Sequence, residues 1–288
     1  YEIMPSLVGS EMCIRDSYMI LRKELKDSLK SKWLVTFAIT FFFLALGVPY
    51  IILGAGGLLP QDYPGMVVGT LITLAVPLVP LVSLAMSSTT VAGERETGTL
   101  EYLLAQPATK SEVFFGKYVG IVLSLTLAMM LGYGGAELIV YATNPTFIIS
   151  FIYALVYSSL LSGASVGLGF IISVLTKTRA AAIGSGLFLC FILVIIYDSG
   201  FLGVITVALN ADSLLLPLTI ANPVETTRIL AMMHMADSPL RGELGPQASY
   251  LLQQYGSIVA SRILAAVLLL WVIVPVLVSY LIFRKQDL

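Results

Sequence analysis

The residues best suited to a specific interaction form one short segment between two long apolar stretches. It opens with three consecutive charged side chains, continues through a glycine and a threonine, and then places leucines at helical spacing before a proline. The glycine bends the chain, the threonine can cap a new helix and the proline stops it. A short helix with one apolar face and charges around it suits docking onto a partner protein; a loop helix resting on lipid is the alternative interpretation. The candidate residues are Glu94, Arg95, Glu96, Gly98, Thr99, Leu100, Glu101, Leu104 and Pro107.

A second candidate is a run of soft metal ligands, Met232, Met233, His234 and Met235. Thioether sulfurs together with an imidazole favour Cu(I). Methionine is also a common filler of apolar helix faces, and adjacent helical positions cannot all point at one ion. Packing is therefore the preferred interpretation of this run, and a metal site is the alternative.

Three ionisable residues lie near the outer ends of apolar stretches: Glu137, Asp198 and Arg262. Charges at such depths usually pair with one another or line a cavity. The sequence predicts an ion pair of Glu137 or Asp198 with Arg262. A structural role is preferred over a role in gating, since all three can also reach interfacial water.

The inventory of reactive residues argues against an enzyme. The chain has one histidine and two cysteines, and it lacks zinc-ligand spacing, an HExxH motif and the GxxxxGK[ST] motif of ATPases. Catalysis would need clustered carboxylates, a histidine pair or a nucleophile beside a base. We therefore expect no catalytic residue and no cofactor bound by this chain. The formal net charge of −1 gives no indication of nucleic-acid binding.

Composition identifies the class of protein that must position these residues. Of the 288 residues, 58% are hydrophobic and only 11% are charged, and the mean hydropathy is +0.94. A soluble domain carries about 25% charged residues. The chain contains long stretches without charged residues, and each is long enough to cross a bilayer. The sequence predicts an all-α polytopic membrane protein with six transmembrane helices, at about residues 33–59, 66–86, 118–143, 147–176, 180–197 and 257–283.

Other segments complete the predicted architecture. Residues 18–33 form a basic amphipathic pattern typical of an interfacial helix, and 88–117 form a long polar stretch. Residues 210–256 contain two predicted short helices, 222–235 and 247–255, which would cover one end of the helix bundle. Residues 8–17 resemble translated sequencing-adapter sequence, so we exclude 1–17 as a non-native leader and treat 18–288 as a single domain.

The basic residues predict the orientation. Cytoplasmic flanks of membrane spans are enriched in lysine and arginine. With six spans, twelve of these residues fall on one side and three (Arg228, Arg241 and Arg262) on the other, which places both termini in the cytoplasm. The twelve are Arg22, Lys23, Lys26, Lys30, Lys32, Arg95, Lys110, Lys117, Lys177, Arg179, Arg284 and Lys285.

The pattern ERETGTLEYLLAQP, followed by a lysine and then Gly116-Lys117, resembles the signature of ABC-2 type transporter permeases. The resemblance extends over the native chain and implies that residues 94–107 form the coupling helix that engages a separate ATP-binding subunit. It further implies a homodimer with two such subunits, ATP and Mg²⁺ on the partner, export as the direction, and the plasma membrane of a prokaryote. The sequence of the interfacial segment at 18–33 and the overall size of the chain resemble most the permease of the copper-processing transporters of nitrous oxide reductase maturation.

A secondary carrier driven by an ion gradient, without ATP, is the alternative from another class. Such carriers place acidic or histidine residues near the membrane midplane. The predicted spans are nearly free of charge at that depth, so the sequence favours the ATP-driven permease.

Overall fold

The computed structural model describes residues 25–26, 29–56, 63–99, 109–141, 148–196, 215–234 and 245–285. Within these ranges all regular elements are helices and no strand occurs, as the sequence predicts. Four of the described helices are long and apolar enough to cross a membrane, and two shorter apolar stretches, Lys32–Val48 and Arg179–Ile195, accompany them. The predicted all-helical membrane class is therefore confirmed. The predicted interfacial helix at 18–33 lies largely outside the described residues.

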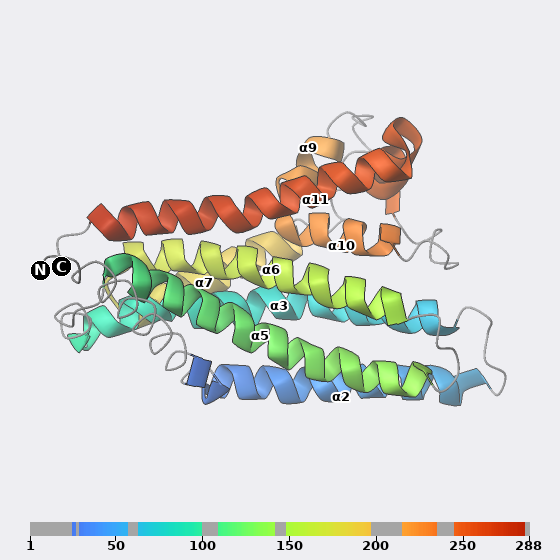
Figure 1. Ribbon diagram of the computed structural model, residues 1–288, viewed down its shortest axis with the longest axis horizontal. Helices are drawn as coiled ribbons and strands as arrows, with labels where there is room; N and C mark the ends of the chain where they lie inside the picture. The colour runs from blue at the N-terminus through green and yellow to red at the C-terminus, as the bar shows by residue number, and fades with distance from the viewer. Residues whose placement is uncertain are drawn as a thin grey trace, which may run out of the picture.

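In the described part of the chain, α2, α3, α5, α6, α7 and α11 run along the long axis of the molecule, and consecutive ones point in opposite directions (Figure 1). Helix α3 packs against α2, α5, α6 and α7, so it occupies the centre of the bundle. The bounds are α2 Lys32–Gly56, α3 Tyr63–Glu96, α5 Lys110–Tyr141, α6 Ile148–Leu175, α7 Arg179–Phe191, its π-helical continuation η2 Ile192–Ile196, and α11 Gly245–Lys285.

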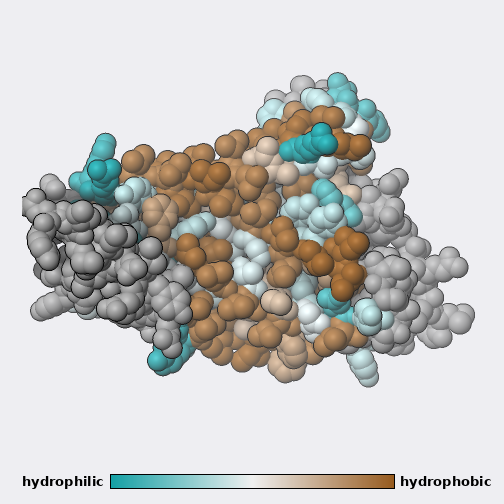
Figure 2. Space-filling model, in the orientation of Figure 1, coloured by the Kyte–Doolittle hydropathy of each residue, from teal (hydrophilic) through white to brown (hydrophobic). Residues whose placement is uncertain are grey.

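The outer surface of the bundle is apolar where a bilayer would surround it. Figure 2 shows hydrophobic side chains over the middle of one face and hydrophilic ones toward its ends. Large apolar side chains such as Phe43, Leu138 and Phe188 expose more than 60% of their surface. Exposure on this scale would be costly in water, and it suits contact with lipid tails.

Two of the predicted boundaries are wrong. Helix α3 continues ten residues beyond the expected end of the second span, to Glu96, and α5 begins at Lys110 instead of Tyr118. Hydroxyl side chains near the end of α3 are compatible with the helix because they can bond to its backbone: Thr90 Oγ1 donates to the Met86 carbonyl oxygen at 3.1 Å. The stretch expected to be an extended polar connection thus consists in large part of helix ends.

The segment between α7 and α11 contributes two short helices, α9 (Leu215–Ile220) and α10 (Pro223–His234). Both predicted helices are confirmed: the first is α10 and the second is the opening part of α11, which breaks at Gly256. Helix α10 does not lie over the end of the bundle, as a cover would. It lies between α6 and α11 (Figure 1), and nine of its residues are buried.

The break in α11 depends on a conformation that only glycine adopts without strain. Gly256 has φ 73° and ψ 162°. We expect Gly256→Ala to lower the free energy of unfolding by about 1–3 kcal/mol, because a Cβ is strained in this region. Unfolding of the purified protein in detergent measures this. The control is Gly134→Ala, since a Cβ at Gly134 meets nothing within 4 Å; equal effects of the two substitutions would contradict the prediction.

Candidate functional site

The candidate site lies at the end of the bundle where α3 and α6 end and α5 and α7 begin, at the left in Figure 1. Glu94, Arg95 and Glu96, here called the charged clamp, form the last turn of α3. Consecutive helical residues point about 100° apart. Because α3 is central, three consecutive side chains can reach three different neighbouring helices, and each one does.

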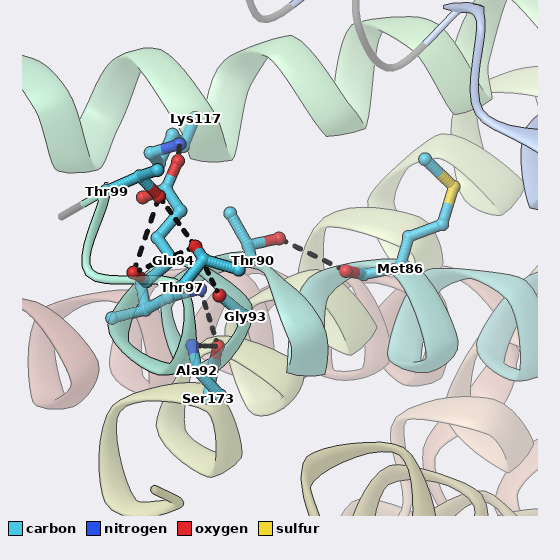
Figure 3. A network of polar contacts seen from close by, with 10 residues as sticks. Met86, Thr90, Ala92, Gly93, Glu94, Thr97, Thr99, Lys117 and Ser173 are labelled. Carbon is cyan, nitrogen blue, oxygen red and sulfur yellow. Dashed lines mark hydrogen bonds and ion pairs between the residues drawn. The ribbon is translucent and has the colours of Figure 1, made fainter. Parts of the chain in front are cut away.

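Glu94 binds α5. Its Oε1 accepts a hydrogen bond from Lys117 Nζ at 2.6 Å (Figure 3), and the side chains are 23% and 6% exposed, respectively. An ammonium group so deeply buried is rare unless it is paired. Lys117 lies two turns into α5, so this ion pair connects the helix that enters the 97–109 segment with the helix that leaves it.

Arg95 binds the end of α6. Its guanidinium donates through Nη1 to the carbonyl oxygens of Val174 and Thr176, each at 3.2 Å. The last carbonyls of a helix have no partner within the helix and carry partial negative charge. Arg95 thus satisfies the carboxyl end of α6 from a neighbouring helix.

Glu96 binds the start of α7. Its Oε2 accepts a hydrogen bond from the Arg179 backbone N–H at 2.6 Å. Thr178, the N-cap residue, accepts from the Ala181 N–H at 3.4 Å. The first amides of a helix lack internal partners and favour a negative charge. The short turn between α6 and α7 is therefore held on both sides by adjacent, opposite charges of α3.

Helices α3 and α6 are also in close contact just inside the clamp. Ser173 Oγ accepts from the backbone amides of Val91 at 2.8 Å and Ala92 at 3.1 Å. One turn further in, Gly169 approaches Ser87 so closely that a Cβ would lie 2.9 Å from the Ser87 Cβ. Small residues allow membrane helices to approach in this way. The clamp is thus anchored on a tight helix pair.

Beyond the clamp the chain turns at Gly98, whose φ of 70° ends α3 as expected. The hydroxyl of Thr99, expected to cap a new helix, donates back to the Glu94 carbonyl oxygen at 3.4 Å (Figure 3). The helix that Thr99 would cap lies outside the described residues. The same holds for four of the candidate residues: Leu100, Glu101, Leu104 and Pro107.

Two features of the site escaped the sequence reasoning. Lys117 is the buried partner of the clamp, whereas the sequence indicates it only as a flanking basic residue and as part of the family signature. Thr109 and Glu112 form a capping box at the start of α5: the Thr109 N–H donates to Glu112 Oε2 at 2.8 Å, and the Glu112 N–H to Thr109 Oγ1 at 3.3 Å. The T-x-x-E spacing is a known helix-start signal and could have placed the beginning of α5 correctly.

The side chains of the methionine–histidine run lie in different environments. Met233 is 8% exposed and packs in the core, whereas His234 is exposed. The His234 Nδ1 lies 3.0 Å from the Leu230 carbonyl oxygen and 3.3 Å from the Tyr157 hydroxyl. Met235 lies outside the described residues. Among the residues that are described, no group of three or more His, Cys, Asp or Glu side chains could hold a metal ion.

The outer-end charges are arranged differently from the expectation. Within the described ranges no ion pair joins Glu137 to Arg262, and Asp198 lies outside them. A different pair is present on α10, where Arg228 Nη2 donates to Glu225 Oε1 at 3.0 Å. Glu225 is only 4% exposed. As the acid three residues after Asn222, Glu225 is a helix-start signal in the sequence, and its burial within the bundle is not expected from that signal.

Comparison with known proteins agrees with this architecture. The sequence model of the family described as "ABC-2 family transporter protein" matches residues 18–288. A protein of Stutzerimonas stutzeri named "Probable ABC transporter permease protein NosY" is 28% identical over 276 residues, which cover 93% of this chain and 97% of the relative. Its namesake in Pseudomonas aeruginosa is 28% identical over 278 residues, covering 94% and 98%. The resemblance predicted from the ERETGTLEYLLAQP segment is confirmed, and the chain belongs to the ABC-2 family of transporter proteins.

Proposed function

We propose that this chain is the membrane-spanning subunit of an ATP-driven exporter, acting as a homodimer with two separate ATP-binding subunits that carry ATP and Mg²⁺. Membership of the ABC-2 family and two relatives named as permeases support a transport subunit. The chain contains no GxxxxGK[ST] motif, so ATP hydrolysis is assigned to the partner.

The observation that carries the proposal is the connection of the charged clamp to α5, α6 and α7 at the end of the bundle where α3 ends and α5 begins. A partner that pushes on the segment between α3 and α5 during ATP binding needs a stiff attachment to the spans. Charge-assisted hydrogen bonds of 2.6 Å are strong and directional. Movement of the segment would therefore shift α3, α5, α6 and α7 together instead of bending one helix.

The distribution of basic residues supports a topology of six spans with both termini in the cytoplasm. The helix ends that share one end of the bundle carry Lys32, Lys110, Arg179, Arg284 and Lys285 (Figure 1). Cytoplasmic flanks are enriched in such residues. This assignment places the clamp, and with it residues 97–109, on the side where ATP is available.

Co-purification with a candidate ABC-type ATP-binding protein co-expressed with this chain tests the proposal. We expect a stable wild-type complex with ATPase activity, and at least a tenfold loss of the complex in a Gly98→Pro/Leu100→Asp variant. Proline cannot adopt the positive φ of residue 98, and aspartate removes apolar docking surface. Gly134→Ala is the control expected to keep the complex. Failure of the wild type to bind any ATP-binding subunit would favour the ion-driven carrier instead.

A further inference from the structure

Asn222, at the turn between α9 and α10, is fully buried and joins two parts of the bundle. Its Oδ1 accepts the Val224 N–H at 2.9 Å, which caps α10. Its Nδ2 donates to the Leu193 carbonyl oxygen at 2.8 Å. The two partners fix the orientation of the amide, because Oδ1 can only accept and Nδ2 can only donate. One side chain thus caps its own helix and holds a neighbouring one.

The carbonyl that Asn222 binds belongs to η2, the π-helical end of the α7–η2 helix. A π turn departs from the regular i→i+4 ladder, and such turns are frequent at functional positions. At its other end the same helix is held by the clamp through the Glu96–Arg179 hydrogen bond. The α7–η2 helix therefore contacts the charged clamp at one end and the α9–α10 hairpin at the other.

The α9–α10 hairpin is held together by hydrogen bonds of its own and is also bonded to α11. Within it, Thr226 Oγ1 donates to the carbonyl oxygens of Thr219 at 2.8 Å and Asn222 at 2.9 Å. Toward α11, the Trp271 indole N–H donates to the Ile220 carbonyl oxygen at 2.9 Å. The buried polar side chains of the hairpin include Glu225, which is 4% exposed. Polar groups this far inside an apolar bundle are expensive and usually serve a function.

We propose that Asn222 is a positioning residue that latches the α9–α10 hairpin to η2, so that α7–η2 carries movement of the charged clamp to the hairpin. The proposal rests on the proposed function, in which ATP acts at the clamp. Coupling between distant sites needs packed elements with two arrangements that both sites bias. The latch supplies such a connection: the hairpin stays seated among α3, α6 and α11 while the Asn222–Leu193 bond holds, and it is released when η2 shifts.

The test uses two substitutions in the hairpin, one that removes the hydrogen bond to Leu193 and one that leaves it in place. As a carboxylate, Asn222→Asp keeps an oxygen that can cap α10 but has no donor for the Leu193 carbonyl oxygen and repels it. Thr226→Val is the control, because Thr226 is equally buried but its hydrogen bonds stay within the hairpin. Both are made in a background in which Ala231, 1% exposed on α10, is replaced by cysteine (A231C) and the two cysteines of the chain, Cys13 and Cys190, by alanine.

The readout is the rate at which A231C reacts with a membrane-impermeant maleimide, in the complex with the ATP-binding subunit, with and without ATP. Without ATP we expect Asn222→Asp to raise the rate about tenfold, since one hydrogen bond is worth about that factor in an opening equilibrium. We expect Thr226→Val to stay within about twofold of the parent. The change in rate on adding ATP should be present in the parent and the control and absent in Asn222→Asp.

The rates without ATP are also measured on the purified chain alone, without the ATP-binding subunit, and this measurement separates failure of the latch from failure of the proposed function. Equal rates for Asn222→Asp and the parent without ATP would overturn the latch. A tenfold rise together with an unchanged response to ATP would overturn the transmission through α7–η2. A rise without ATP, combined with a parent that binds no ATP-binding subunit, would keep the latch and overturn the ATP-driven permease.

Discussion

If the proposed function holds, replacing Lys117 with methionine is expected to uncouple the ATP-binding subunit from the spans, so that its ATPase activity no longer depends on this chain, and to lower the free energy of unfolding by about 3 kcal/mol. The substitution preserves the length of the side chain but leaves the Glu94 carboxylate, which is 23% exposed, without its ammonium partner. Breaking a buried ion pair from one side is costly because the remaining charge stays desolvated. It also removes the link between α3 and α5.

Unfolding in mixed micelles measures the stability, and the part of the ATPase activity that depends on adding this chain to the ATP-binding subunit measures the coupling. Lys177→Met is the control: Lys177 is exposed on the turn between α6 and α7, so we expect a change below about 0.5 kcal/mol. The exchanged pair Glu94→Lys/Lys117→Glu should recover part of both losses, since the attraction is restored with opposite sign. An exchanged pair no better than the Lys117→Met single variant, or a normally coupled Lys117→Met protein, would refute the role assigned to this pair.

Gly169→Ala is expected to destabilise the protein by about 1–3 kcal/mol through forced separation of α3 and α6. An added Cβ would meet the Ser87 hydroxyl, lie 2.9 Å from the Ser87 Cβ and 3.2 Å from the Ser88 backbone nitrogen. A change of rotamer can move the hydroxyl, but it cannot move the Cβ or the backbone. The Ser173 contacts to Val91 and Ala92 should weaken in the same variant, because they need the same close approach.

Thermal unfolding of the detergent-solubilised protein measures the effect. The matched control is Gly184→Ala on α7, where a Cβ would meet nothing within 4 Å, and we expect it to be neutral or slightly stabilising. Adding Ser87→Gly to Gly169→Ala should restore most of the lost stability, because it removes both close atoms of the serine side chain. If Gly169→Ala and Gly184→Ala unfold alike, the tight α3–α6 contact is not a source of stability.

Local features of the sequence were sufficient to predict the class of protein, its family and several helix boundaries. Composition alone identified a helical membrane protein, because a bilayer requires long uncharged helices whatever their neighbours. The helix that begins at Pro223 follows from an asparagine cap, a proline and an acid in sequence order. The break at Gly256 falls between the two helices predicted on either side of it. The segment that begins at Glu94 was sufficient to recognise the family.

Only the tertiary structure decided which residues far apart in the sequence contact one another. Glu94 meets Lys117 from 23 positions away, Ser173 meets Ala92 from 81, and Asn222 meets Leu193 from 29. The burial of α10 between α6 and α11 also has no signature in the pattern of its residues. Hydrophobic periodicity reports which face of a helix avoids water, but in a membrane both the lipid and most of the neighbouring helix surfaces are apolar. Which side chains meet depends on the offset between packed helices, and that offset is set by close contacts such as Gly169 against Ser87.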